Sequence, residues 1–465
     1  MSFDWTRRDF IQRAAAFSAA MAAAQAAFAQ QEKKEGDKPK EKKKDKEKVE
    51  KPKPNPKNAQ LRVAFVGVGG KGNHNLHALA ECGVTVAALC DIDSKFLEKA
   101  AAEFPNAKKY VDFRQMMEKD NKEFDAVCIS TPDHTHAPAA MLAMHFNKHV
   151  YCEKPLTHNI AEARLLTETA RKSKVVTQMG NQGHSAEGSE EQVQWVKSGV
   201  IGPVKEVHVW TDRPIWPQGM PMPKDTGSAP EAINWDLWLG PAPERPYSSA
   251  YHPFKWRGYW DFGTGALGDM ACHIMDTAVW SLNLTNPTSV EAFSEGKTDV
   301  SGPLWSVIRY EFPQRGELPP VKMFWYDGRL MPPTKYGSSD KLGDNGAIFV
   351  GDKGTIAAKY TQRPVILEEK LAKEYKPATQ PTTRPGGFDH HHHLEWVEAC
   401  VGSGKKPGSN FDYAGPLTET VLLGNFAVRM GRRIEWDAKN MKCTNVPEAN
   451  QYVTREYRKG FELIT

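Results

Sequence analysis

Between Leu61 and about residue 180, short apolar runs alternate with longer stretches whose apolar positions recur at helical spacing. The runs are rich in Val, Ile, Phe and Cys, and they are short enough to predict buried strands. Strands that alternate with helices of about ten to fifteen residues are typical of βαβ units, in which helices cover both faces of a parallel sheet. The predicted order is strand 63–66, helix 73–81, strand 84–89, helix 94–104, strand 124–129, helix 137–146, strand 149–152, helix 160–173 and strand 175–179.

Beyond Gly202 the pattern changes to strand-like stretches separated by loops rich in Pro and Gly. Successive strands with few helices between them are typical of an antiparallel sheet. The sequence therefore predicts an α/β Rossmann domain followed by an α+β domain. In the second half we expect strands at 204–211, 288–293, 305–312, 321–326, 347–350 and 354–360, and helices at 187–198, 266–282, 393–401 and 416–430.

The first strand–helix–strand segment carries a glycine motif. Gly67, Gly69 and Gly72 follow the first strand with the spacing G-x-G-x-x-G, and Gly70 lies in the same turn. In a dinucleotide-binding unit these glycines allow a tight turn, a close approach of the pyrophosphate and close helix packing. The N-terminus of the following helix offers free N–H groups to the phosphates.

Asp91 ends the second strand, about twenty residues after the last glycine, where an acid is expected to bind the adenosine ribose hydroxyls. A carboxylate there repels a 2′-phosphate, so the predicted cofactor is NAD, with NADP disfavoured. The alternative is a glycine turn that binds nothing. The two strands, the helix and the terminal acid argue together for the nucleotide.

Two polar segments directly follow later strands, at the sheet edge where ligands bind in such folds. The first is S-T-P-D-H-T-H at 130–136, and the second is E-K-P at 153–155. The alternatives are an ordinary polar loop and a surface lysine. The residues predicted to contact the cofactor are Thr131, Pro132, His134, His136, Glu153 and Lys154.

A third candidate lies on the predicted helix at 266–282. Asp269 and His273 are four residues apart and therefore share a helix face. A carboxylate beside an imidazole raises the histidine pKa and fixes the ring, which is the layout of a general base. A zinc ligand pair and a surface salt bridge remain alternatives, although no third metal ligand appears at a clear spacing.

The glycine motif, the S-T-P-D-H-T-H segment and C-E-K-P together resemble the glucose–fructose oxidoreductase and inositol dehydrogenase family, Gfo/Idh/MocA, over about residues 61–436. The resemblance implies a second domain with a large open, mainly antiparallel sheet. It also implies that Lys154 contacts substrate and nicotinamide, and that Lys154, Asp269 and His273 form the catalytic set. In alcohol oxidation His273 would accept the hydroxyl proton, Lys154 would stabilise the oxygen, and Asp269 would hold the pair.

Further site residues are expected near the junction of the two domains. The segment G-N-Q-G-H-S at 180–185 supplies Asn181 as a cofactor contact and His184 as a substrate contact. An unusually aromatic stretch suits sugar faces, although at least half of its rings should be core packing. Arg257, Trp260 and Tyr251 are the substrate candidates there.

Four consecutive histidines at 390–393 are interpreted as a loop and helix cap, with metal binding as the weaker alternative. No metal site is predicted.

The first 60 residues differ in composition from the rest. T-R-R-D-F-I at 6–11, an alanine-rich run and A-F-A at 27–29 indicate a twin-arginine signal peptide over residues 1–29, rather than a cytosolic amphipathic helix. This implies the twin-arginine translocation machinery as a partner and a location in the periplasm or cell envelope. Residues 30–60 are rich in Lys, Glu and Pro and are predicted to be a disordered tether.

Charge excludes one class of partner. The basic pI comes from the leader and tether, and the body beyond them carries slightly more acidic than basic residues, so no nucleic-acid partner is expected. No stretch is apolar enough for a stable membrane span.

We therefore expect a Rossmann domain at 61–180 and a substrate and oligomerisation domain at 181–465, in a homo-oligomer. The predicted function is an exported NAD-dependent oxidoreductase for a sugar or polyol hydroxyl, with tightly bound cofactor. An NAD-dependent glycoside hydrolase of the α-N-acetylgalactosaminidase type and a non-catalytic nucleotide or sugar binder are the alternatives.

Overall fold

The computed structural model describes residues 51–224, 227–378, 380–403 and 405–464. The predicted signal peptide and most of the predicted tether lie outside these ranges. For the end of the tether the prediction is wrong, because Pro56–Gln60 form a 3₁₀ helix, η2. Asn58 in this helix is buried and donates its side-chain amide to the Cys82 carbonyl at 2.7 Å, which fastens the segment to the first domain.

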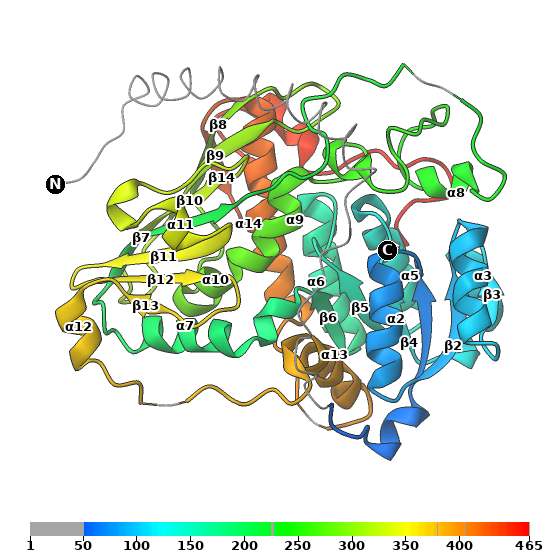
Figure 1. Ribbon diagram of the computed structural model, residues 1–465. Helices are drawn as coiled ribbons and strands as arrows, with labels where there is room; N and C mark the ends of the chain where they lie inside the picture. The colour runs from blue at the N-terminus through cyan, green and yellow to red at the C-terminus, as the bar shows by residue number, and fades with distance from the viewer. Residues whose placement is uncertain (1–50, 225–226, 379, 404, 465) are drawn as a thin grey trace, which may run out of the picture. The chain divides into compact units, whose positions relative to one another are not determined.

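The first domain is built on a six-stranded sheet with the order β3-β2-β1-β4-β5-β6, drawn in blue to teal in Figure 1. All of its strand pairs are parallel. Its order reverses between β1 and β4, and ligands bind at the carboxyl ends of the strands at such a point. The strands are β1 (Arg62–Val66), β2 (Thr85–Cys90), β3 (Lys108–Tyr110), β4 (Ala126–Ile129), β5 (His149–Glu153) and β6 (Thr177–Gly180).

Five helices connect these strands and cover both faces of their sheet. The prediction is confirmed for the main strands and helices, whereas β3 and the helix after it were missed. β3 has only three residues, none of them buried, so it carries no apolar run. The helices are α2 (Lys71–Glu81), α3 (Ser94–Glu103), α4 (Phe113–Asp120), α5 (His136–His145) and α6 (Ile160–Ser173).

The second half contains a nine-stranded sheet, ordered β13-β12-β11-β7-β10-β9-β8-β14-β15. Neighbouring strands are antiparallel except β7 and β10, which are parallel. The predicted mainly antiparallel sheet is confirmed. Its strands are β7 (Val204–Thr211), β8 (Ser289–Glu295), β9 (Trp305–Phe312), β10 (Val321–Tyr326), β11 (Asn345–Gly351), β12 (Thr355–Lys359), β13 (Val365–Ile366), β14 (Ile434–Asp437) and β15 (Lys442–Cys443).

Helices α9 and α14 pack on this sheet, and Figure 1 shows them between it and α6 of the first domain. The single helix predicted at 266–282 is two helices, α9 and α10, with Met275 between them. The helices of this half are α7 (Glu187–Lys197), α8 (Trp235–Leu239), α9 (Gly265–Ile274), α10 (Asp276–Leu282), α11 (Ser339–Leu342), α12 (Glu369–Glu374), α13 (Gly387–Cys400) and α14 (Phe411–Met430).

The two halves share one of the apolar cores, and a second core packs α2, α3 and α13 against the first sheet. A continuous cluster of buried side chains joins the parallel sheet, α5 and α6 to α9, α14 and the nine-stranded sheet. Arg164 of α6 pairs with Glu419 of α14 through two hydrogen bonds of 2.8 and 2.7 Å. Helix α13 packs back on α2, so the later part of the chain also supports the first domain.

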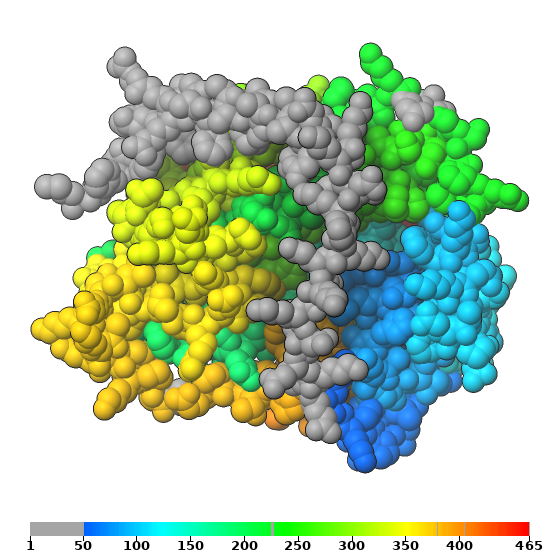
Figure 2. Space-filling view, viewed as in Figure 1, coloured from blue at the N-terminus to red at the C-terminus, as the bar shows by residue number. Residues whose placement is uncertain are grey.

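The loops around α8 run along the carboxyl-end side of the first domain. The amide of Asn234 donates to the Ile92 carbonyl at 2.9 Å, and the amide of Ser94 donates to the Ala232 carbonyl at 2.8 Å. Figure 2 shows these loops, in green, against the blue domain. Within the described ranges, no helix is long and apolar enough to cross a membrane.

Candidate active site

A cavity of about 800 Å³ lies at the carboxyl ends of the parallel strands. Its wall contains the glycine turn and the ends of β2, β4 and β5 on one side. The loops after α8 and the helix α9 supply the other side. The cavity therefore joins the predicted nucleotide motif to the predicted catalytic residues.

The glycine end is shaped by backbone that has no room for side chains. Gly67 has φ +81°, and a Cβ there would lie 2.8 Å from the Ser130 carbonyl oxygen. A Cβ on Gly72 would lie 2.0 Å from the Gly67 carbonyl oxygen. Gly70, with φ +48°, faces open space at the start of α2. These are the properties that a pyrophosphate-binding turn requires.

Asp91 lines the same end of the cavity and holds the glycine turn in place by hydrogen bonds. One carboxylate oxygen accepts from the amides of Val68 and Gly69 at 2.8 and 3.2 Å, and the other accepts from the amide of Asp93 at 2.9 Å. Burial raises the pKa of Asp91, and these three amide hydrogen bonds oppose the rise. Contact with the ribose hydroxyls stays a prediction.

The opposite end holds Lys154, directly after β5. Its Nζ donates to the Asp269 carboxylate at 2.6 Å and to the Asp269 carbonyl at 2.8 Å. The guanidinium of Arg257 lies 3.4 Å from the same carboxylate. Burial opposes ionisation of Asp269, but Lys154 and Arg257 hold its pKa well below the usual value. The lysine and aspartate of the predicted set are therefore in direct contact.

His273, one turn further along α9, also lines the cavity but has a different partner. Its Nδ1 lies 3.2 Å from the hydroxyl oxygen of Tyr360. Burial and the nearby Lys154 ammonium lower the pKa of His273 to about 3, although Asp269 acts in the opposite direction. Burial therefore outweighs the carboxylate, and the pKa of His273 is lowered where the spacing predicted a base poised near neutrality. Tyr360 follows β12 and carries no motif that sequence reasoning could have used.

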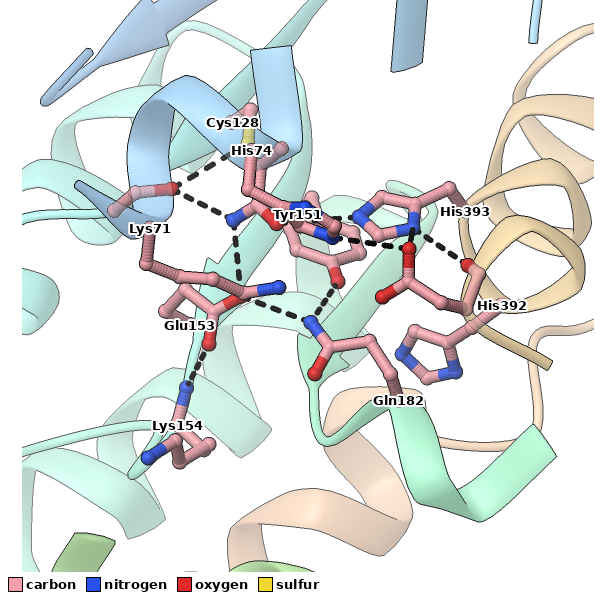
Figure 3. Close-up of polar contacts among 12 residues, drawn as sticks. Lys71, His74, Cys128, Tyr151, Glu153, Lys154, Gln182, His392 and His393 are labelled. Atoms are coloured by element: carbon pink, nitrogen blue, oxygen red, sulfur yellow. Dashed lines mark hydrogen bonds and ion pairs between the residues drawn. The ribbon is translucent and has the colours of Figure 1, made fainter. Parts of the chain in front are cut away.

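Glu153 lies beside Lys154 at the centre of a polar network, shown in Figure 3. Its carboxylate accepts from the side-chain amides of Asn75 at 2.9 Å and Gln182 at 3.0 Å, and Lys71 lies 3.9 Å away. Burial works against the charge, but Lys71 and the Asn75 hydrogen bond hold the pKa of Glu153 below its usual value. The cavity thus has an ionised carboxylate in its wall.

The four-histidine run at 390–393 packs against this network and helps to fix it. It lies inside the first turns of α13, so the predicted loop and cap is wrong. His393 stacks on Tyr151 with ring centroids 5.2 Å apart, and its Nε2 lies 3.2 Å from the Asn75 side-chain oxygen. His392 contacts the Ser185 hydroxyl and the Met179 carbonyl at 2.8 and 2.9 Å. In the part of the chain that the structure describes, no group of His, Cys, Asp and Glu side chains could hold a metal ion.

Besides Gly72, which packs against the Gly67 carbonyl, three predicted cofactor contacts do not line the cavity. The ring nitrogens of His134 lie 3.2 and 3.0 Å from the carbonyl oxygens of Phe262 and Trp238. Those of His136 lie 2.8 and 2.9 Å from the carbonyl oxygens of Pro155 and Thr131. Both rings are turned into the protein, where they fix loops. The third is Asn181, whose amide lies 3.3 Å from the Asp276 carboxylate, while its neighbour Gln182 lines the cavity.

Of the substrate candidates, only Arg257 lines the cavity. Trp260 donates its indole N–H to the Thr298 carbonyl at 3.3 Å, and His184 pairs with Asp276 at 2.9 Å. Tyr251 is buried in an aromatic cluster. The aromatic wall consists instead of Trp238, His252, Phe254 and Trp256.

The residues at the cavity fit a dinucleotide. Gly67, Gly69 and Gly70 line its glycine end, Asp91 faces it, and Thr131 and Pro132 line its middle. The Thr131 hydroxyl is a buried polar atom without a hydrogen-bond partner among the described residues. A polar ligand beside it would satisfy a group that is otherwise costly to bury.

Two family models match the chain. One, described as an oxidoreductase family with an NAD-binding Rossmann fold, matches residues 61–181, and its C-terminal alpha/beta domain model matches residues 204–317. The chain belongs to the Gfo/Idh/MocA oxidoreductase family. Its first domain is the NAD-binding domain of that family, which confirms the predicted cofactor and fold class.

The curated proteins with similar sequences include inositol 2-dehydrogenases and glycosyl hydrolase family 109 proteins. Inositol 2-dehydrogenase of Salmonella paratyphi B is 32% identical over 152 residues, which are 32% of this chain and 45% of the relative. A glycosyl hydrolase family 109 protein of Shewanella woodyi is 30% identical over 152 residues, 30% of this chain and 32% of the relative. The matches span less than half the length of these relatives.

Solved structures share the fold over most of the chain. The WlbA dehydrogenase of Bordetella pertussis, in complex with NADH and UDP-GlcNAcA, has a TM-score of 0.58 at 18% identity and covers 81% of this chain and 99% of its own. The aldose-aldose oxidoreductase of Caulobacter crescentus, complexed with glycerol, has a TM-score of 0.55 at 17% identity, with 81% and 99% covered.

Proposed function

We propose that the protein is an NAD-dependent oxidoreductase that acts on a secondary hydroxyl of a sugar, polyol or sugar derivative. The observation that carries the proposal is the single cavity that is lined by the glycine turn at one end and by Lys154, Asp269 and His273 at the other. Family membership and the dehydrogenases among the relatives support it.

The chemistry follows from the side chains at the lysine end. NAD, when bound, supplies the hydride acceptor. Lys154 donates two of its three N–H groups to Asp269, which leaves one for a substrate oxygen. His273 faces the same end of the cavity. His273 would accept the hydroxyl proton, and the free N–H of Lys154 would stabilise the negative charge that develops on the oxygen.

The charge balance at this end favours an uncharged sugar. Arg257 lies between Asp133, at 3.2 Å, and Asp269, at 3.4 Å, and Lys154 is paired with the same Asp269. Both cations are already matched by carboxylates, so neither offers an unpaired charge to an acidic substituent. The aromatic wall around Trp256 suits the apolar face of a sugar ring.

We further propose that the protein is exported folded by the twin-arginine route to the periplasm or cell envelope and works there as a homo-oligomer. The T-R-R-D-F-I pattern and the A-F-A site support export. Because free NAD is scarce outside the cytoplasm, the cofactor must then be held tightly and reoxidised in place, by the same cycle or by a second substrate.

A second candidate is an NAD-dependent glycoside hydrolase, in which a sugar carbon is oxidised, the aglycone leaves by elimination, water adds in its place and the carbon is reduced again. The similarity to glycosyl hydrolase family 109 proteins favours it. The same cofactor and the same lysine and histidine would serve both reactions. A non-catalytic nucleotide or sugar binder ranks third, because the predicted catalytic side chains are present.

One experiment distinguishes these functions. The purified protein is denatured and the released nucleotide is identified, and native protein is then assayed for NADH absorbance and for product against a panel of neutral sugars, polyols and aryl glycosides. Net oxidation of a free sugar or polyol supports the oxidoreductase. Release of the aryl group without net change in NADH supports the hydrolase. Absence of bound or bindable nucleotide would overturn both.

A further inference from the structure

A second, smaller cavity lies apart from the nucleotide cavity, where α6, α14 and the loop before α9 meet. Its volume is about 40 Å³. A single water needs about 10–15 Å³ of such space, so the cavity admits a small ion or a few waters and excludes a sugar or a nucleotide. No acidic side chain of the described residues lines it, and its lining includes His158, Asn159, Trp260, Thr264, Arg429 and Tyr452.

Arg429, in the last turn of α14, brings a positive charge to this cavity. Its guanidinium carbon lies 5.3 Å from the centre of the Trp260 ring and 4.0 Å from that of the Tyr452 ring. Such contacts use the flat faces of the guanidinium and leave N–H groups at its edges available. Burial lowers the pKa of Arg429, and the carboxylates of Asp261 and Asp299 act on it without forming an ion pair. The charge is therefore partly desolvated and has no counter-ion among the described residues.

The N-terminal end of α6 faces the same cavity, because its first residue, Ile160, and its cap, Asn159, both line it. The first turn of a helix has unpaired amide N–H groups and a partial positive charge. The Asn159 side chain is only 7% exposed, and its Oδ1 accepts from the Glu162 amide at 3.0 Å. Its Nδ2 is buried without a hydrogen-bond partner among the described residues. A buried donor of this kind is costly unless a ligand or water accepts from it.

The imidazole of His158 adds one more donor to the lining. Both of its ring nitrogens are buried, and neither has a hydrogen-bond partner among the described residues. Burial lowers the pKa of His158 well below its usual value, and the nearby Arg455 acts in the same direction. The ring is therefore neutral and carries a single N–H.

The carboxylate of Glu162, also at this end of α6, does not cancel the charge of Arg429. It accepts from the backbone amides of His158 and Asn159 at 3.0 and 3.2 Å. Its other oxygen lies 3.2 Å from the Arg455 guanidinium. Glu162 is thus matched by its own partners and lies outside the lining of the cavity.

We propose that this cavity binds a small monovalent anion, for which chloride is the abundant candidate, between the Arg429 guanidinium, the Asn159 side-chain amide and the N-terminal end of α6. A water in the same place would accept from the amide but would leave the guanidinium without a counter-ion. The charge, the donors and the absence of acidic side chains from the described lining together select an anion.

The position of the site gives the anion a structural role. It joins the start of α6, which follows the Lys154 loop, to α14 and to the loop that carries Thr264. The Thr264 hydroxyl donates to the Asp133 carboxylate at 2.6 Å, and Asp133 lies 3.2 Å from Arg257 at the nucleotide cavity. The anion therefore fastens segments from both halves of the chain, and its binding does not depend on the proposed reaction.

Crystals of the full protein soaked in sodium bromide locate the ion, because bromide replaces chloride and is recognised by its anomalous scattering. We expect an anomalous peak within hydrogen-bond distance of the Arg429 guanidinium and the Asn159 Nδ2. Density for water alone at that place, in the presence of bromide, would overturn the proposal.

Thermal unfolding measures the binding in solution. The unfolding midpoint in about 300 mM sodium chloride is compared with the midpoint in sodium gluconate at the same ionic strength, since gluconate is too large for the cavity. A ligand that binds only the folded protein raises the midpoint, and we expect a rise of about 2–4 °C that saturates with a dissociation constant on the order of 10 mM.

Asn159→Asp is the decisive variant, because it keeps the capping oxygen and replaces the donor with a negative charge. It should abolish the rise caused by chloride, and Arg429→Gln, which removes the positive charge, should do the same. Arg432→Gln is the matched control, since Arg432 pairs with Glu448 at 3.4 Å outside the cavity, and it should keep the rise. An equal rise in Asn159→Asp and the unaltered protein would contradict the proposal. A bromide peak without any rise would mark an adventitious ion only and would overturn it as well.

Discussion

The two ends of the cavity are built in different ways. The glycine end comes from one continuous segment, in which Gly67, Gly69 and Gly70 expose backbone and Asp91 fastens the turn. The lysine end is assembled from side chains of distant segments, with Lys154 after β5, His273 on α9 and Tyr360 after β12. Cofactor binding is therefore a local property of the chain, whereas the chemistry depends on the packing of both halves.

Lys154→Met should impair catalysis at the lysine end and leave NAD binding at the glycine end nearly unchanged. It removes the ammonium that pairs with Asp269 and contacts the substrate oxygen, so we expect kcat/KM to fall by about 10³-fold or more. NAD affinity, measured by calorimetry, should change by less than about threefold. Lys205→Met, at an exposed ion pair with Asp352, is the control. A loss of activity below about tenfold would show that Lys154 does not contact the reacting oxygen.

Gly67→Ala should impair NAD binding at the glycine end. The new Cβ would meet the Ser130 carbonyl at 2.8 Å, and the backbone has φ +81°, so the turn must distort. We expect NAD affinity to fall about 100-fold, measured by fluorescence titration. Gly199→Ala is the matched control, because Gly199 has φ +72° but no neighbour within 4 Å of a Cβ. Equal NAD affinities of the two variants would mean that the turn does not hold the nucleotide.

Asp91→Asn tests the predicted ribose contact at the glycine end and should lower NAD affinity less than Gly67→Ala does. Asn can still accept hydrogen bonds from the turn but has no charge to repel a 2′-phosphate. We expect NAD affinity to fall about tenfold and the preference for NAD over NADP to weaken, with the ratio of the two affinities as the internal control. An unchanged ratio would show that Asp91 does not contact the ribose.

Lowering the pH should reduce the stability of the fold through two buried histidines, His393 and His134. Burial lowers the pKa of His393 to about 4 and that of His134 to about 3. Their folded-state pKa values lie below the unfolded value of about 6.5, so their contribution to stability is present above that pH and is lost as pH falls toward the folded values. Each should cost about 1 kcal/mol between pH 6.5 and 5.5.

Urea unfolding at the two pH values measures this loss. His393→Gln removes one of the protons involved and should shrink the pH-dependent difference in unfolding free energy by about 1 kcal/mol. His145→Gln is the control, since His145 is exposed at the end of α5. If His393→Gln leaves the difference unchanged, His393 is not the neutral buried base that the structure indicates.

The sequence predicts the glycine end well because spacing and backbone geometry determine it. Gly67, Gly72 and Asp91 lie where the motif requires, and the alternating apolar runs predict the parallel sheet. Lys154 and Asp269, which each stand in a recognisable motif, are in direct contact as the predicted set requires, and their catalytic roles stay a prediction. Local pattern is sufficient where function depends on a single strand–turn–helix unit.

Sequence reasoning fails where burial and tertiary contacts decide. His134 and His136 stand in a motif, yet their rings bind carbonyl groups away from the cavity. The spacing of Asp269 and His273 is correct, but neighbouring Lys154 and burial reverse the expected pKa shift. Tyr360 comes from a segment without any motif, and only the fold brings it to His273.

The contact between α6 and α14 has a consequence for how the nucleotide enters and leaves. Because the two helices share one core and Arg164 binds Glu419, the halves of the molecule are not separated by a hinge. Trp238 on α8 and Phe254 on the loop after it line the cavity, so we expect access to depend on local motion of this segment. We therefore expect a bound dinucleotide to leave slowly, which would let one molecule of it support many turnovers.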